Sequence, residues 1–121
     1  MPARHLAAKE LGALLSVLAH PARLQIVEEL GLRELDVRAL ADTLGLSQPG
    51  VSQHLGLLRA HRLVSERREG RRVFYRLRRP ELAAWLLEGL GFLAEPLASV
   101  EDRRQLMNAA RATWSGEVRD G

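Results

Sequence analysis

The fold is decided by residues 35–64, which read LDVRALADTLGLSQPGVSQHLGLLRAHRLV. Within this stretch a helix stop and a helix start lie only two residues apart. Gly45 stands where helices commonly end in a left-handed residue, and Ser47 is a favoured N-cap for the helix that follows. The stretch therefore predicts two helices, 37–44 and 48–60, joined by a tight turn.

Four further residues in this stretch support the same interpretation. Asp36 is the expected N-cap of the first helix, and Pro49 is tolerated in the first turn of the second, where the backbone donors have no helical partner. Ala41 is small where the two helices must cross, and Val51 packs the second helix against the first. A helix-turn-helix needs these residue types in this order, since its helices cross at about 90–120° around a turn of about 3–4 residues.

The flanking sequence completes a recognisable architecture. Leucines at helical spacing predict a helix over 5–18, and His20-Pro21 begins another that runs to Leu30 and is ended by Gly31. After residue 60 the period changes from helix to strand. The segments 63–68 and 72–77 are expected to pair as a β-hairpin through a two-residue loop, Glu69-Gly70, with arginines at its tip.

Helical spacing resumes after Pro80 and continues to Glu95-Pro96, and a last helix is predicted over about 100–114. The predicted fold is mainly α with a small β-hairpin: four helices, two strands, a fifth helix and a C-terminal helix, forming a winged helix-turn-helix. Residues 1–98 are expected to form the DNA-binding and dimerisation domain. Residues 99–121 are expected to form an extension with a short helix and a polar tail.

Composition and charge limit the class of protein. The chain has 121 residues, a net charge of +3 and no cysteine, which excludes disulfides and thiolate metal sites within it. Residues 62–79 hold eight arginines and two glutamates, so the rest of the chain sums to −3. A basic patch on a mildly acidic body is the electrostatic pattern of a protein that binds a polyanion. With no apolar run long enough to span a membrane and no signal peptide, the chain is expected to be cytoplasmic.

The exposed face of the 48–60 helix carries side chains suited to double-stranded DNA. Glutamine can make a bidentate bond to adenine, so Gln48 and Gln53 are the predicted base readers, while Ser47 and Ser52 are assigned to phosphate. The arginines of the wing would contact the adjacent backbone or minor groove and supply salt-dependent affinity. These are Arg67, Arg68, Arg71 and Arg72.

An enzymatic interpretation of the same helix fails on geometry. Ser52 and His54 lie two residues apart, on opposite faces of a helix, and cannot form a nucleophile–base pair. His54 is expected at the edge of the core, away from the bases. No catalytic residue is predicted.

With these residues identified, the sequence resembles the ArsR/SmtB family of bacterial repressors. The resemblance covers about residues 10–95 and rests on 18-LAHPARLQIVEEL-30, on the stretch quoted above and on 67-RREGRRVFYRL-77. It implies a homodimer that binds an inverted repeat, represses a promoter and releases DNA when it binds an effector. The implied dimer interface uses the first helix and the helix after the wing: Leu6, Leu11, Leu14, Leu18, Leu82, Trp85, Leu86, Leu90 and Leu93.

The sequence departs from the family at its known effector sites. Thiol sensors of the family carry cysteines where this chain has Asp36 and Arg38, and residues 80–98 contain no histidine for the site on the helix after the wing. Only His5 could join a divalent metal site, with carboxylates such as Glu10. Arg62 stands where the family often has glycine, so it is expected either to strain that turn or to contact phosphate.

Three functions therefore remain open. The first is a sequence-specific homodimeric repressor with a small-molecule, metal or protein effector. The second is a winged helix that binds another protein through its hairpin and its C-terminal helix, whose apolar face would carry Val100, Met107, Ala110 and Trp114. The third is a repressor that senses nickel or zinc through His5, with no other cofactor expected.

Overall fold

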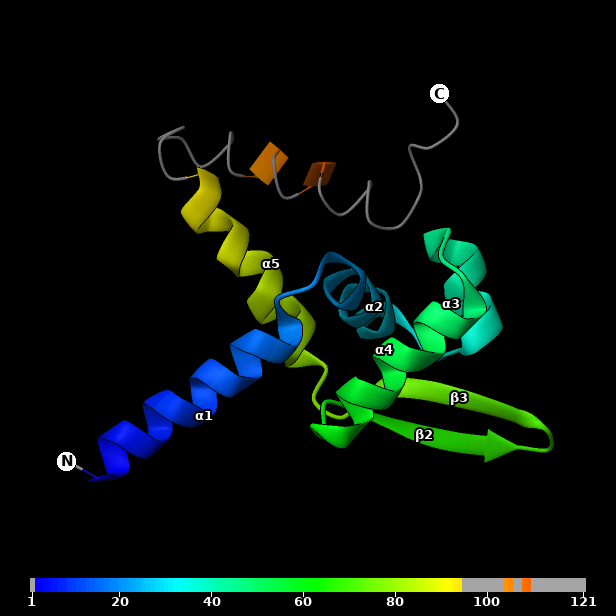
Figure 1. Ribbon diagram of the computed structural model, residues 1–121. Coiled ribbons are helices and arrows are strands. Elements are labelled where there is room, and N and C mark those ends of the chain that lie inside the picture. Colours follow the sequence, from blue (N-terminus) through cyan, green and yellow to red (C-terminus); the bar gives the residue numbers. More distant parts are fainter. Residues whose placement is uncertain (1, 95–103, 106–107, 110–121) are drawn as a thin grey trace.

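The computed structural model describes residues 2–94, 104–105 and 108–109 (Figure 1). The mainly helical prediction is confirmed. The elements are α1 (Pro2–Leu18), α2 (Pro21–Leu32), β1 (Leu35–Asp36), α3 (Val37–Leu44), α4 (Gln48–Ala60), β2 (Val64–Glu69), β3 (Arg72–Leu77) and α5 (Glu81–Ala94). The predicted helix 100–114 and the extension 99–121 lie outside the described residues, apart from 104–105 and 108–109, which are helical.

The start and end signals of the helix-turn-helix act as the sequence predicts. The Asp36 side chain accepts a hydrogen bond from the backbone N–H of Ala39 at 2.8 Å and so caps α3. Gly45 ends α3 in the left-handed region, at φ 68° and ψ 34°. The Ser47 hydroxyl accepts from the backbone N–H of Gly50 at 3.1 Å and caps α4. Since each contact spans only a few residues, local sequence is sufficient to place both helices.

The predicted end of α2 at Gly31 is wrong. The helix continues to Leu32, and the backbone N–H of Arg33 still bonds to the carbonyl of Glu29. Gly31 lies where α2 meets α5, and a Cβ added there would stand 2.4 Å from the Cβ of Ala83. This glycine therefore permits close helix packing and does not terminate the helix.

The wing contains one strand more than predicted. The two-residue β1 pairs with β3, giving a three-stranded antiparallel sheet in the order β1-β3-β2. The hairpin loop is Gly70-Arg71, one residue later than predicted, because Glu69 still pairs with Arg72. Gly70 has φ +62°, so glycine is placed where the turn requires a left-handed residue.

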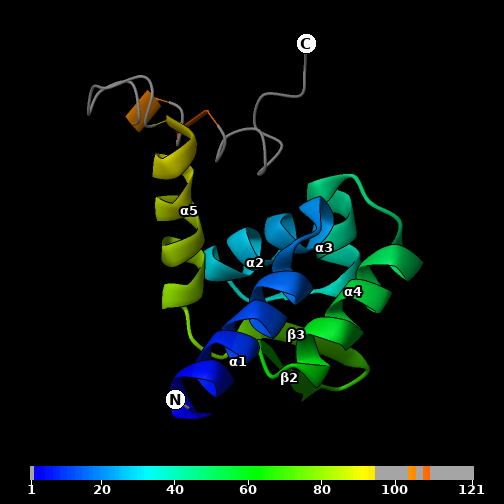
Figure 2. The same ribbon diagram turned by 60° about the vertical axis from the view of Figure 1, so that its left-hand side comes forward.

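The core lies where α2, α3 and α4 meet the base of the sheet. The core side chains that are 0% exposed are Ile26, Val27, Leu40, Val51, Leu55 and Leu58. Most of α1 projects away from this body, and α5 projects on the same side, far from the tip of the β2–β3 hairpin (Figures 1 and 2). Among the described residues, no helix is both long enough and apolar enough to cross a membrane.

Candidate nucleic-acid interface

Helix α4 is held firmly by one face and leaves the opposite face open. Val51, Leu55 and Leu58 are each 0% exposed. The polar residues of the other face are exposed: Gln48, Ser52, Gln53 and, at the N-cap, Ser47. The buried face packs α4 on the core, so the polar face is presented by a rigid element, as a surface that reads a groove requires.

Ser47 has a structural task besides any contact with DNA. Its oxygen accepts the hydrogen bond from Gly50 that caps α4. A hydroxyl also carries one donor hydrogen, which the cap does not use. Capping and phosphate binding are therefore compatible at this residue.

The four wing arginines divide into two kinds. Arg67 lies 2.7 Å from Glu34 and 2.7 Å from Glu69, and Arg72 lies 2.8 Å from Asp36. Both guanidinium groups also stand over the ring of Phe74, at 4.8 Å and 4.6 Å from its centroid. These two arginines brace the hairpin against the segment before α3, a task that charge and spacing in the sequence did not reveal.

The electrostatics of this brace favour the charged forms of its members. The hydrogen bond from Arg67 holds the pKa of Glu34 below its ordinary value. The backbone N–H of Ala39, followed by Arg72, does the same for the pKa of Asp36. The carboxylates in turn raise the pKa of Arg67. Neutralisation of the wing by proton loss or gain is therefore disfavoured near neutral pH.

Arg68 and Arg71 differ from this pair. Both side chains are exposed, and neither side chain has a hydrogen bond or ion pair within the described part of the chain. They lie at and beside the hairpin loop, Arg68 opposite Val73 and Arg71 next to Gly70. Of the four predicted wing arginines, these two are therefore the most available to a phosphate backbone.

A contact between two histidine side chains helps to hold α4 in place. The rings of His20 and His54 lie 4.6 Å apart between centroids. Arg23 donates from Nε to His54 Nδ1 at 3.3 Å and from Nη1 to the carbonyl of Val17 at 2.6 Å. The contact links α4 to the junction of α1 and α2, where His20 caps α2 by accepting from the backbone N–H of Ala22 at 3.1 Å.

His54 is thus half-buried at the core edge, as predicted, but its partners were missed. Burial lowers its pKa, and the neighbouring His20 and Arg23 lower it further. A neutral imidazole is needed for Nδ1 to accept from Arg23. The partners are 31 and 34 residues away in sequence, so no spacing rule connects them.

The apolar residues assigned to a dimer interface fall into three groups. Leu6, Leu11, Trp85 and Leu93 are 46–72% exposed, and Leu15 and Phe92, which the sequence assignment omitted, are exposed beside them. Four others are half-buried: Leu14, Leu82, Leu86 and Leu90. Leu18 is only 2% exposed, because the last turn of α1 packs into the protomer's own core. Its side chain therefore cannot be offered to another chain.

The two residues proposed to bind a metal ion, His5 and Glu10, are both exposed on α1. Across the part of the chain that the structure describes, no three or more histidine, aspartate or glutamate side chains gather where they could hold a metal ion.

Comparison with known proteins agrees with this geometry. Residues 20–66 match the model of the family described as "Bacterial regulatory protein, arsR family". The chain is 43% identical over 90 residues to the biofilm growth-associated repressor of Agrobacterium fabrum, covering 74% of this chain and 76% of that protein. The crystal structure of NolR from Sinorhizobium fredii has a TM-score of 0.68 and 38% identity, covering 77% and 92% of the two chains.

A third relative is a solution structure from Mycobacterium bovis, described as a homodimeric winged helix-turn-helix DNA-binding domain. Its TM-score is 0.66 and its identity 28%, over 76% of this chain and 89% of that one. Sequence, fold and relatives agree on a DNA-binding transcriptional regulator of the winged helix-turn-helix type and not on an enzyme. The chain belongs to the arsR family of bacterial regulatory proteins.

Proposed function

We propose that this protein is a homodimeric repressor that reads an inverted repeat with two copies of α4. The observation that carries the proposal is the two-faced α4, whose apolar side is completely buried and whose glutamines are exposed. Two symmetry-related helices spaced by one helical turn of DNA would meet successive major grooves. One relative is named a repressor, and another is described as a homodimeric DNA-binding domain. Both support the same function.

Gln48 and Gln53 are the proposed base readers, and Ser47 and Ser52 the proposed phosphate contacts from α4. Arg68 and Arg71 would add phosphate contacts from the wing, while Arg67 and Arg72 would hold the hairpin in position. Base contacts give sequence preference, whereas phosphate contacts give affinity that falls with salt.

The test is a selection from random duplexes with the full chain, followed by binding measurements on the recovered site. A palindromic site is expected. Gln48→Ala and Gln53→Ala should each lower discrimination against a single mismatched base pair by about 1–3 kcal/mol. Ser16→Ala, on the exposed surface of α1, is the control and should keep full discrimination. Recovery of no palindrome would contradict the proposal and favour a winged helix that binds another protein.

The proposed dimer uses the exposed apolar face of α1 and α5. A chain that leaves several large side chains of this kind in water has a surface suited to association. Leu6→Asp is expected to shift the dimer toward monomer in sedimentation equilibrium. Leu32→Asp is a matched control, since Leu32 is also 56% exposed but lies at the end of α2. Equal dissociation of both variants would contradict this choice of interface.

A further inference from the structure

Arg23, in the first turn of α2, joins α4 to the last turn of α1. Its Nε donates to His54 Nδ1 of α4 at 3.3 Å, and its Nη1 donates to the carbonyl of Val17 at 2.6 Å. The last carbonyls of a helix have no partner within the helix and attract positive charge. One guanidinium therefore closes the C-terminal end of α1 and contacts α4 at the same time.

Both ends of this link are fixed in the fold. Val17 is only 7% exposed, since the last turn of α1 packs into the protomer's core. His54 lies next to Leu55 of α4, which is 0% exposed. The ring of His54 also lies 4.6 Å from that of His20, whose Nδ1 caps α2. Loss of the contact with Arg23 would therefore change how α4 is held against α1 and α2.

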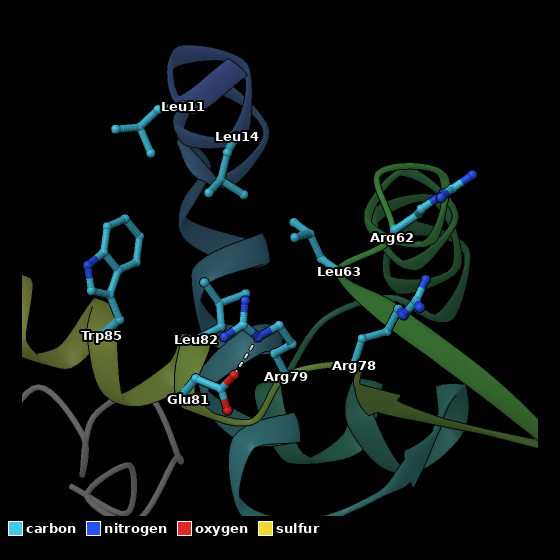
Figure 3. Close-up of a pocket in the computed structure, with 9 residues that line it drawn as sticks. All are labelled: Leu11, Leu14, Arg62, Leu63, Arg78, Arg79, Glu81, Leu82 and Trp85. Atoms are coloured by element: carbon cyan, nitrogen blue, oxygen red, sulfur yellow. Dashed lines mark hydrogen bonds and ion pairs between the residues drawn. The ribbon is translucent and has the colours of Figure 1, made fainter. Parts of the chain in front are cut away.

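The position of α4 relative to α1 matters because α1 belongs to the proposed dimer face. Figure 3 shows its leucines facing α5 across an apolar groove of about 450 Å³. The residues of that groove assigned to the dimer are Leu11, Leu14, Leu82 and Trp85. In a symmetric dimer built on this face, the orientation of α4 relative to α1 sets the distance and the angle between the two copies of α4. An inverted repeat is bound only when that distance matches one helical turn of DNA.

The contact between Arg23 and His54 requires a neutral histidine. Nδ1 of His54 accepts the hydrogen bond, whereas both nitrogens of a protonated imidazole are donors. Protonation would turn an N–H of His54 toward the N–H of Arg23 and add a positive charge beside the guanidinium and the ring of His20. Arg23 would keep its second acceptor, the carbonyl of Val17, so the part released would be α4.

No carboxylate of the described residues compensates for that positive charge. α4 packs against α2, α3 and β2, and the carboxylates of these elements are Glu28, Glu29, Asp42, Glu66 and Glu69. None of them contributes to the pKa of His54, whereas burial, His20 and Arg23 all lower it. The last turn of α1 carries no charged side chain. Proton uptake by His54 is therefore opposed by the folded arrangement and favoured once the contact is broken.

We propose that Arg23 is a positioning residue for DNA binding, which holds α4 in the orientation that an inverted repeat requires only while His54 is neutral. Protonation of His54 breaks the hydrogen bond and frees α4 from the end of α1, so the two copies of α4 no longer match the repeat. The protein would then release DNA as pH falls. This regulation rests on the function proposed above.

The link itself is tested by NMR titration of the His54 imidazole in the full chain without DNA. Since burial, His20 and Arg23 lower the pKa of His54, it should titrate below the ordinary value of about 6.5. Arg23→Gln removes a donor and a positive charge, and should move the titration of His54 toward the ordinary value. The same titration in both proteins would overturn the proposal.

The release of DNA is tested by measuring affinity for the selected site between about pH 5 and 8 at constant salt, with circular dichroism to check the fold. The bound chain holds fewer protons at His54 than the released chain. Affinity should therefore fall by up to about tenfold per pH unit for each protomer below about pH 6.5. An exposed histidine near phosphate gives the opposite sign, because negative charge favours its protonated form. Affinity that rises or stays constant as pH falls would overturn the positioning role.

Three substitutions separate this role from packing alone. His54→Gln keeps an acceptor for Arg23 but cannot be protonated, so it should bind the site at neutral pH and lose most of the pH dependence. His61→Gln is the matched control, because His61 is the exposed C-cap of α4, and it should keep the pH profile of the natural protein. Arg23→Gln should weaken binding at neutral pH by about tenfold, the equivalent of one hydrogen bond from a charged group.

If Arg23→Gln does not fold, His54→Gln still decides the matter, since a pH profile equal to that of the natural protein would overturn the proposal. Failure of the proposed function gives a different result. A chain that selects no palindromic site refutes the repressor function and the positioning role together, while the NMR titration still reports the contact. Selection of a palindrome with affinity independent of pH overturns the positioning role alone.

Discussion

The close contact between α2 and α5 can be tested by adding one methyl group. In Gly31→Ala the new Cβ would lie 2.4 Å from the Cβ of Ala83, whereas carbon atoms in contact prefer about 3.5–4.0 Å. Neither Cβ can rotate away, because both are attached directly to helical backbone. The two helices must therefore separate by more than about 1 Å, and α5 carries part of the proposed dimer face.

The expected magnitude combines two opposing terms. Overpacking of a well-packed contact costs about 1–3 kcal/mol, while replacing glycine by alanine inside a helix contributes about 1 kcal/mol of stability. Because both colliding atoms belong to the backbone scaffold, the overlap should be near the upper limit. The net change expected for Gly31→Ala is a loss of about 1–2 kcal/mol in the free energy of unfolding.

The assay is chemical denaturation at one fixed protomer concentration, since dimerisation makes stability depend on concentration. Gly56→Ala is the control: it is also helical, a Cβ there would meet nothing within 4 Å, and it should gain up to about 1 kcal/mol. The double variant Gly31→Ala/Ala83→Gly removes the overlap and should return close to the natural stability. If Gly31→Ala is at least as stable as the natural protein, or if Ala83→Gly fails to rescue it, the packing argument is refuted.

Three further predictions concern stability and the wing. Arg62→Gly should raise the free energy of unfolding by about 1–2 kcal/mol, the cost of a left-handed non-glycine residue; no gain in denaturation would mean that the turn is unstrained. Since burial lowers the pKa of His54, the unfolded chain binds more protons, so stability should fall as pH decreases below about 6.5, and less steeply in His54→Gln. If His54→Gln leaves the dependence of stability on pH unchanged, this prediction is wrong. Arg68→Gln should reduce the dependence of log affinity on log salt by about 1 without changing stability, whereas Arg67→Gln, which removes the brace to Glu34, should lower the hairpin's protection from hydrogen exchange. Identical effects of the two substitutions would refute the division of the wing arginines.

Much of the fold could be predicted from the sequence because its signals act over a few residues. Asp36 and Ser47 cap the starts of α3 and α4, and Gly45 ends α3, each through a contact with a residue no more than four positions away. The apolar spacing of α4 selects the face that is buried. Its exposed face, with Gln48 and Gln53, was predicted for the same reason. The charge of the hairpin was equally evident, since it depends on composition alone.

Other features depend on residues that come together only in the folded chain. Gly31 was interpreted as a helix end, because a glycine that ends a helix and one that allows another helix to approach look alike until Ala83 is placed beside it. β1 is too short to show strand periodicity and exists only because β3 lies next to it. The bracing of Arg67 by Glu34 and the contact of His54 with His20 each join residues more than 30 positions apart.

The sequence by itself therefore determined the order of the elements and which face of α4 is exposed and proposed to meet DNA, because both follow from short-range periodicity and capping. The tertiary structure decided which arginines are available and which are already paired, because ion pairing depends on distance in space. It also decided that Arg23 joins His54 to the last turn of α1. No pattern along the chain contains that arrangement, since it requires the end of α1, the first turn of α2 and the middle of α4 to be packed together.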